Sequence, residues 1–93
     1  MSYELEFLES ALKEWKKLDA NTREQFRKKI EERCENPRVR SAQLHGSKDR
    51  YKIKLRSAGY RFVYAVEDER LVVLVIAIGK RERSEVYEIA RKR

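Results

Sequence analysis

The chain is poor in the residue types on which disulfides, metal sites and paired-imidazole catalysis depend. Its 93 residues include one cysteine, one histidine, one proline and three glycines. A single cysteine forms no intrachain disulfide, and we interpret Cys34 as a small core residue. His45 has no second imidazole with which to share acid and base catalysis, and the isolated glycines form no phosphate-binding loop. We therefore expect neither a metal nor a cofactor.

Long apolar segments are absent as well. The longest apolar run covers residues 71–78, whereas a membrane-spanning helix needs about 20 residues. The first residues carry acids instead of the basic and apolar stretches of a secretory signal. We expect a cytoplasmic protein with no membrane segment. With 41% hydrophobic and 42% charged residues, the composition predicts one folded domain over residues 1–93 with a small core.

Positive charge is abundant and unevenly distributed. The chain has 23 lysines and arginines against 16 acidic residues, a net charge of +7. Residues 1–35 carry 8 basic and 9 acidic side chains, whereas residues 36–93 carry 15 and 7. A one-sided positive field attracts polyanions, which favours a nucleic acid or an acidic protein as partner. A generic basic surface without a specific partner is the alternative that charge alone leaves open.

Hydrophobic periodicity predicts an α+β fold in the order β-α-α-β-β-β-α. Residues 3–7 alternate as in a short strand with one buried face, and residues 8–18 have the spacing of an amphipathic helix. Asn21 or Thr22 is predicted to cap a second helix, which ends before Pro37. Its buried stripe consists of Phe26, Ile30 and Cys34. A polar connecting loop is expected over residues 38–50.

Two alternating segments, residues 51–56 and 60–66, predict a β-hairpin. A two-residue turn at Ala58 and Gly59 would place Leu55 opposite Phe62. That register also sets Ile53 opposite Tyr64 and Arg56 opposite Arg61. Lys52 and Lys54 would then share the exposed face, about 6.6 Å apart.

The segment over residues 71–78 is apolar on both faces, which predicts a central strand of a small antiparallel sheet. The two N-terminal helices would cover one face of that sheet. A short helix capped by Ser84, with Val86, Ile89 and Ala90, would shield the other. Because this last helix is short, we expect it to be loosely held.

A convergent set of cations on or near one sheet face is the main candidate site. Its members are Lys52, Lys54, Arg56 and Arg61 on the hairpin and Lys80, Arg81 and Arg83 where the last strand ends. Like charges placed opposite each other destabilise a sheet, so a bound polyanion is expected to relieve the repulsion. For any single lysine, an outward position that protects an edge strand explains the residue better.

Tyr87, on the last helix, adds a possible base above this face. Nearby cations would favour its phenolate and lower a pKa that is about 10 when unperturbed. A shift of two units needs about 2.7 kcal/mol, which two or three close cations shielded from solvent can supply. The alternative, a tyrosine ring that only packs against the sheet, is equally compatible with the sequence.

Two stretches closely resemble the RelE toxins of bacterial toxin–antitoxin pairs, within the RelE/ParE superfamily. They are Tyr51-Lys-Ile-Lys-Leu-Arg-Ser-Ala-Gly-Tyr-Arg-Phe-Val-Tyr64 and Val75-Ile-Ala-Ile-Gly-Lys-Arg-Glu-Arg-Ser-Glu-Val-Tyr87. The resemblance covers nearly the whole chain. It implies a fold similar to small microbial ribonucleases and a metal-independent endoribonuclease that cleaves messenger RNA in the ribosomal A site and thereby inhibits translation.

By the same resemblance, Tyr87 matches the general base for the ribose 2′-hydroxyl, and Arg81 matches the residue that assists departure of the 5′-oxygen. Lys52, Lys54 and Arg61 match the cations that hold the scissile phosphate. Cleavage would leave a 2′,3′-cyclic phosphate and a 5′-hydroxyl. Arginine is a poor general acid because its pKa is so high, so we expect Arg81 to act electrostatically. Lys52 or a ribosomal group is left to supply the proton.

The implied partners are the 70S ribosome with messenger in its A site and a cognate RelB-like antitoxin that displaces the last helix. Arg56, Lys80 and Arg83 are expected to bind RNA or the ribosome, and operator DNA is expected to be contacted only through the antitoxin complex. Two other functions stay open. One is a non-catalytic RNA- or ribosome-binding module, and the other is a ParE-like toxin that inhibits DNA gyrase.

Overall fold

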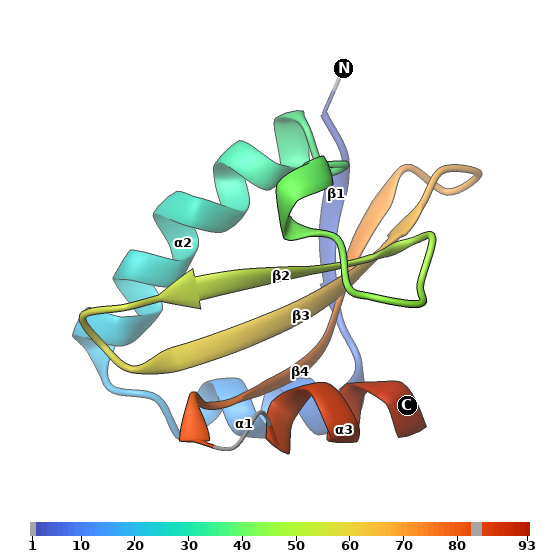
Figure 1. Cartoon of the computed structure of the whole chain (residues 1–93). Helices are drawn as coiled ribbons and strands as arrows, with labels where there is room; N and C mark the ends of the chain where they lie inside the picture. Colours follow the sequence, from blue (N-terminus) through green and yellow to red (C-terminus); the bar gives the residue numbers. More distant parts are fainter. Residues whose placement is uncertain (1, 83–84) are drawn as a thin grey trace.

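Four strands form one sheet with helices on both faces (Figure 1). The computed structural model describes residues 2–82 and 85–93. The elements follow the predicted order: β1 (Glu4–Phe7), α1 (Glu9–Lys16), α2 (Ala20–Glu35), a 3₁₀ turn η1 (Arg40–Ala42), β2 (Arg50–Leu55), β3 (Tyr60–Glu67), β4 (Val72–Lys80) and α3 (Glu85–Lys92). None of the helices in this described part of the chain is both long and apolar enough to cross a bilayer.

The strand order in the sheet is β1-β4-β3-β2, so β4 is central as predicted. The antiparallel expectation holds for β2, β3 and β4, whereas β1 pairs in parallel with β4 and makes the sheet mixed. A parallel neighbour needs a long crossover, and here α1, α2 and the hairpin together provide it. Tyr3 and Phe7 pack against the core, whereas Leu5 on this edge strand stays 40% exposed, so the buried face predicted for residues 3–7 forms only in part.

The hairpin register differs from the prediction by two residues. Leu55 pairs with Tyr60 and Ile53 with Phe62, so Lys54 and not Arg56 lies opposite Arg61. The turn has four residues, 56–59, and the Gly59 amide donates to the Leu55 carbonyl over 2.8 Å. Gly59 adopts a φ of +72°, a conformation that glycine permits without strain. The shift is even, so every side chain keeps its predicted face.

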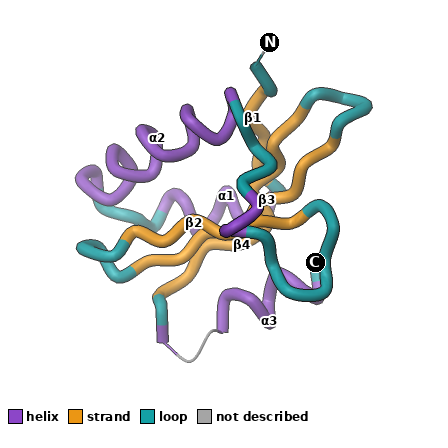
Figure 2. Tube along the Cα trace, turned by 45° about the horizontal axis from the view of Figure 1, so that its top comes forward, coloured by secondary structure: helices purple, strands orange, loops and turns teal. Residues whose placement is uncertain are grey.

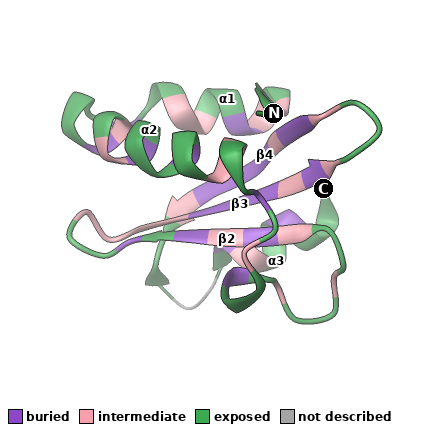
Figure 3. Ribbon diagram, turned by 90° about the horizontal axis from the view of Figure 1, so that it is seen from above, coloured by how far each residue is buried: buried purple, intermediate pink, exposed green. Residues whose placement is uncertain are grey.

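The two sheet faces carry separate cores (Figure 3). On the α1 and α2 side, a continuous series of aromatic contacts joins β1, both helices and β3 through Phe7, Trp15, Phe26 and Phe62, with the last pair stacked. Phe26 lies 4.0 Å from Phe62 between ring centroids, and both are fully buried. Cys34 packs half-buried against this core, as predicted, and burial raises the pKa of its thiol.

Side-chain hydrogen bonds hold both ends of α2. Its N-cap is Asp19, whose carboxylate accepts from the Thr22 amide, so the predicted caps Asn21 and Thr22 are two and three residues too late. Thr22 is itself buried. At the other end, Arg33 donates over 2.9 Å to the hydroxyl of Tyr64, and that hydroxyl donates to the Pro37 carbonyl. These bonds fix the entry into the loop that precedes β2.

α3 covers the opposite face of β3 and β4, as predicted (Figure 2). A register shift between Val63 and Tyr64 lets consecutive residues Ile76 and Ala77 of β4 both face α3. They pack with Val63 against Val86 and Ala90 of the helix. Val86 and Ala90 are buried, and a hydrogen bond from Arg93 to the Ile76 carbonyl holds the end of the helix. The expectation of a loosely held helix is therefore not supported. The predicted cap Ser84 lies outside the described residues.

Candidate functional site

The cations of β2 and β3 lie on the face that α3 covers. Lys54, Arg61 and Gly79 form one cross-strand row, and Lys52, Val63 and Ala77 form the next. Alternation along the strands gives all six positions the same face. Lys54 is exposed, whereas Lys52 and Arg61 are half-buried. Lys52, Lys54 and Arg61 thus lie on one sheet face, although their pairing differs from the one predicted.

The missing side chain at Gly79 lets α3 approach the sheet closely. A Cβ atom on Gly79 would lie 3.2 Å from the Cβ atom of Val86, closer than ordinary carbon–carbon contact. Val86 in turn is 1% exposed and immediately precedes Tyr87. The height of the tyrosine above the cationic row therefore depends on a glycine in β4.

Tyr87 lies over this face as predicted, but its electrostatics differ from the expectation. Its hydroxyl is buried and has no hydrogen-bond partner within the described residues. Burial raises the pKa of the Tyr87 phenol. The Arg61 guanidinium lies close by without forming a geometrically good hydrogen bond, and neither its charge nor its nearby N–H groups compensate. The predicted lowering of this pKa is wrong for the free chain, because desolvation of the phenolate outweighs the nearby positive charge.

A cleft of about 510 Å³ opens beside Tyr87, between α3 and the loop before β2. Lys52, Arg50 and Arg91 line it together with the loop residues Leu44, His45, Gly46 and Ser47. Sequence reasoning missed Arg50 and Arg91 here, because nothing local shows that the start of β2 and the end of α3 adjoin. It also left His45 aside, although the cleft brings this imidazole near Tyr87.

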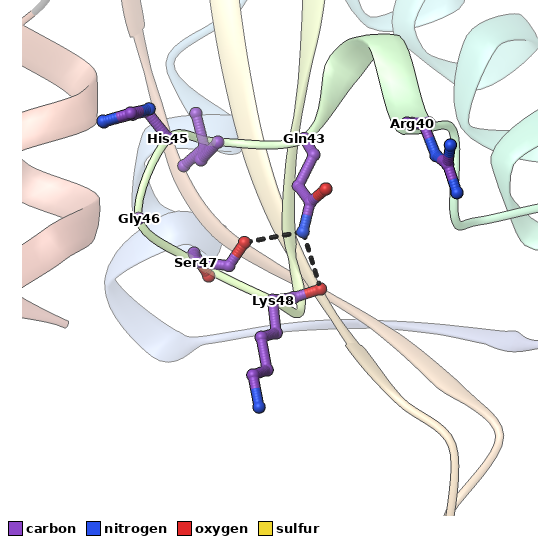
Figure 4. A pocket seen from close by; sticks show the side chains of 7 residues that line it. Arg40, Gln43, His45, Gly46, Ser47 and Lys48 are labelled. Carbon is purple, nitrogen blue, oxygen red and sulfur yellow. Dashed lines mark hydrogen bonds between the residues drawn. The ribbon is translucent and has the colours of Figure 1, made fainter.

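The loop wall of the cleft is held by its own hydrogen bonds (Figure 4). The Gln43 side-chain amide donates to the carbonyls of Ser47 and Lys48, over 2.7 and 3.2 Å. Gly46 has a φ of +81°, so a glycine suits this corner. In Figure 4, His45 extends from the loop towards α3. The wall is therefore built before any ligand arrives.

The remaining predicted cations are arranged less uniformly. Arg81 directly follows β4, is exposed, and donates its amide to the Gly59 carbonyl. It lies two residues after Gly79, beyond the last pair of β3 with β4. Lys80 pairs with Tyr60, whose ring packs on the α1 and α2 core, so Lys80 belongs to the opposite face. Arg56 is exposed in the hairpin turn. Arg83 lies outside the described residues.

Repulsion within the cluster shows in Lys54. Its pKa lies below the usual lysine value, first because of the charge on Lys52, then desolvation and the charges of Arg56 and Arg61. Residues 2–82 and 85–93 contain no group of three His, Cys, Asp or Glu side chains placed to hold a metal ion. What the described site offers is a set of fixed cations around a tyrosine, which suits binding of a phosphodiester and stabilisation of its developing charge.

Comparison with known proteins places this architecture in a class. A family model described as the ParE toxin of a type II toxin–antitoxin system, parDE, matches residues 5–85. The fold and the match together define a toxin of the type II toxin–antitoxin class.

Comparison with individual relatives identifies the family within this class. The chain is 59% identical over its full length, and over 98% of the relative, to the mRNA interferase toxin RelE of Escherichia coli strain K12. A variant of the Escherichia coli RelE toxin in the free state superposes with a TM-score of 0.91 at 56% identity, covering 99% of this chain and 97% of the other. A complex of such a variant with an antitoxin RelBc peptide gives 0.85 at 57% identity, covering 97% and 95%. The chain belongs to the RelE toxins of the RelE/ParE family.

Proposed function

We propose that the chain is an mRNA interferase toxin that cleaves messenger RNA in the ribosomal A site and is neutralised by a RelB-like antitoxin. The observation that carries this proposal is the 59% identity over the full chain to an mRNA interferase RelE. The site supports it, because the cations that would bind the phosphate and the tyrosine that would accept the proton lie on one face. The chain acts as one domain in the cytoplasm, where translating ribosomes are.

In the proposed reaction, the ribose 2′-oxygen attacks the adjacent phosphorus while the bond to the 5′-oxygen breaks. Tyr87 first loses its own proton to solvent and, as the phenolate, accepts the 2′-hydroxyl proton, while Lys52, Lys54 and Arg61 stabilise the charge that develops on the phosphorane. Arg81 stabilises the departing 5′-oxygen electrostatically. The proton that this oxygen needs comes from a lysine of the cluster or from the ribosome. The products are a 2′,3′-cyclic phosphate and a 5′-hydroxyl.

The burial of Tyr87 fits a dependence on the ribosome. In the free chain the Tyr87 hydroxyl has no hydrogen-bond partner among residues 2–82 and 85–93, and burial raises the pKa of the phenol, so it stays protonated at neutral pH and is a poor base. Positioned messenger would bring the ribose 2′-hydroxyl to Tyr87, and a hydrogen bond donated by that hydroxyl favours the phenolate. Free RNA, which lacks that positioning, is then expected to be a poor substrate.

The antitoxin is expected to act on the last helix, since α3 carries Tyr87 and closes the cleft. A complex between a close relative and a RelBc peptide supports a partner of this kind. We also propose that Arg56, Lys80 and Arg83 bind RNA or the ribosome. Binding of operator DNA, where it occurs, belongs to the antitoxin complex.

The test is cleavage of messenger on programmed ribosomes by the wild-type chain and by Tyr87→Phe. Loss of a general base lowers the rate by about 10²–10⁴-fold, whereas ribosome binding should persist. Arg70→Gln is a matched control, because it breaks an exposed ion pair with Glu6 on β1. Equal cleavage by the wild type and Tyr87→Phe would refute the assigned base, and absence of cleavage by the wild type would refute the function.

Two competing functions predict different results in the same assay. The family model is named for ParE toxins, and a ParE-like chain would inhibit DNA gyrase and leave messenger intact. A non-catalytic RNA-binding module would bind ribosomes in a salt-sensitive way and release no cyclic phosphate. Detection of the 2′,3′-cyclic end on the cleaved messenger separates the proposed function from both.

A further inference from the structure

We propose that Glu14 and Arg93 position Tyr87 by clamping the far end of α3 to α1 and β4, a role that rests on the proposed function. The guanidinium of Arg93 donates to both carboxylate oxygens of Glu14, each over 3.0 Å. It also donates over 2.9 Å to the Ile76 carbonyl of β4. The last residue after α3 is thereby bonded to a different helix and to the central strand.

Glu14 is suited to this role because it is itself anchored to the sheet. Pairing between β1 and β4 ends at Phe7 and Val75, which leaves the Ile78 amide beyond the reach of β1. The Oε1 atom of Glu14 accepts from that amide over 3.0 Å. The Glu14 carboxylate therefore accepts the hydrogen bond that a neighbouring strand would otherwise accept, and it also accepts from Arg93. Through this carboxylate, α1 is bonded both to β4 and to the residue that follows α3.

The environment of this pair distinguishes it from surface ion pairs. The side chains of Arg93 and Glu14 are 22% and 25% exposed. Each other ion pair in the described part of the chain has a partner at least 55% exposed. Bidentate geometry and partial burial reduce screening and fix direction as well as distance. The pair therefore fixes the position of Arg93, and with it the end of α3, relative to α1.

A second bond holds the middle of the same helix. Arg50, at the start of β2, donates to the carbonyl of Ala90 in α3. With Val86 packed against Gly79, the helix is then held at its beginning, middle and end. These contacts keep the Tyr87 hydroxyl buried, with no hydrogen-bond partner in the part of the chain that the structure describes, which is unfavourable for that group taken alone. Such an arrangement is typical of a functional group whose missing partner is the substrate.

The experiment uses Arg93→Gln, Glu14→Gln and the double variant, with Arg70→Gln as the control that loses a surface ion pair. On programmed ribosomes we expect each clamp variant to lower kcat about tenfold to a hundredfold with KM within about twofold, since catalysis is sensitive to displacements near 1 Å. The double variant should lose no more than the worse single variant, because both substitutions break one contact. Glu14→Gln retains an oxygen for the Ile78 amide and guards against a folding defect.

A second readout needs no ribosome. The phenolate absorbance of the isolated chain is titrated, and the curve of a matching Tyr87→Phe variant is subtracted to isolate Tyr87. Loosening of α3 should move the Tyr87 midpoint down towards its ordinary pKa of 10.0, because burial is the main cause of its elevation. Arg70→Gln should leave this midpoint unchanged.

The outcomes separate this inference from the proposed function. An unshifted Tyr87 midpoint, a change in KM alone, or additive losses in the double variant would overturn the clamp. If the wild type cleaves nothing, the proposed function fails, while a shifted midpoint in Arg93→Gln still supports the clamp as a device that positions Tyr87.

Discussion

Substitution of Gly79 by alanine should lower the cleavage activity much more than it lowers the stability of the fold. The new Cβ atom would lie 3.2 Å from the Cβ atom of Val86 and 3.5 Å from its Cγ2 atom. Ordinary carbon–carbon contacts are about 3.5–4.0 Å, so α3 has to move outward by about 0.3–0.8 Å. The contact atoms belong to a buried side chain and its backbone, and they leave no flexible end to absorb the change.

The cost in stability should be small. Overpacking by one methyl group is unfavourable, but alanine loses about 0.4–1 kcal/mol less conformational entropy on folding than glycine. The cost in activity should be larger, because Tyr87 follows Val86 directly and catalytic groups must be held within about 0.5 Å. We expect Gly79→Ala to lower kcat about tenfold with a melting temperature near that of the wild type.

The assay is cleavage on programmed ribosomes, normalised to folded protein, beside thermal unfolding followed by circular dichroism. Phe26→Leu is the matched control, because Phe26 is buried on the other face and its loss should cost about 1 kcal/mol without moving α3. Full activity of Gly79→Ala would refute the argument. So would a parallel loss of stability and activity like that of Phe26→Leu.

Three further predictions concern hydrogen bonds and charge. Tyr64→Phe removes the hydroxyl that donates to the Pro37 carbonyl over 2.6 Å, and urea unfolding should show a loss of about 1–3 kcal/mol. Asp19→Ala should lower the melting temperature at pH 7. Because the capping bond lowers the Asp19 pKa below 3.8, this stabilisation is complete above about that pH and disappears as pH falls through the folded value, so the two proteins should converge in acid. Lys52→Gln should raise the pKa of Lys54 towards 10.5, since the charge on Lys52 is the main cause of its lowering, and an unshifted NMR titration of the Lys54 amine would contradict this.

The elements themselves follow from local patterns. Alternation and helical spacing predicted the class and order correctly, because apolar periodicity reports which face of an element is buried. The helix cap was misplaced, since several residues near the start of α2 are acceptable caps and only backbone geometry selects Asp19. The hairpin register was also missed, because Gly59 permits both a two-residue turn and the four-residue turn that forms.

The sequence predicts correctly that the cations of β2 and β3 share a face, because the face of a residue depends only on alternation along its strand. Lys52, Lys54 and Arg61 share a face in either register, since the error was an even number of residues. Their exact partners were not recoverable, and neither was the position of Lys80 on the opposite face. The latter depends on how β4 pairs with β3 across a register shift.

What the sequence by itself determined is the set of elements, their buried faces and the gathering of positive charge in the second half of the chain. Tertiary structure alone decided the parallel pairing of β1, the closeness of α3 to Gly79 and the burial of the Tyr87 hydroxyl. Local patterns record the environment of one side chain at a time. The pKa of Tyr87 is raised because segments that are distant in the sequence bury it. Contacts between distant segments produce no periodic pattern in the sequence, so local patterns could not predict this shift.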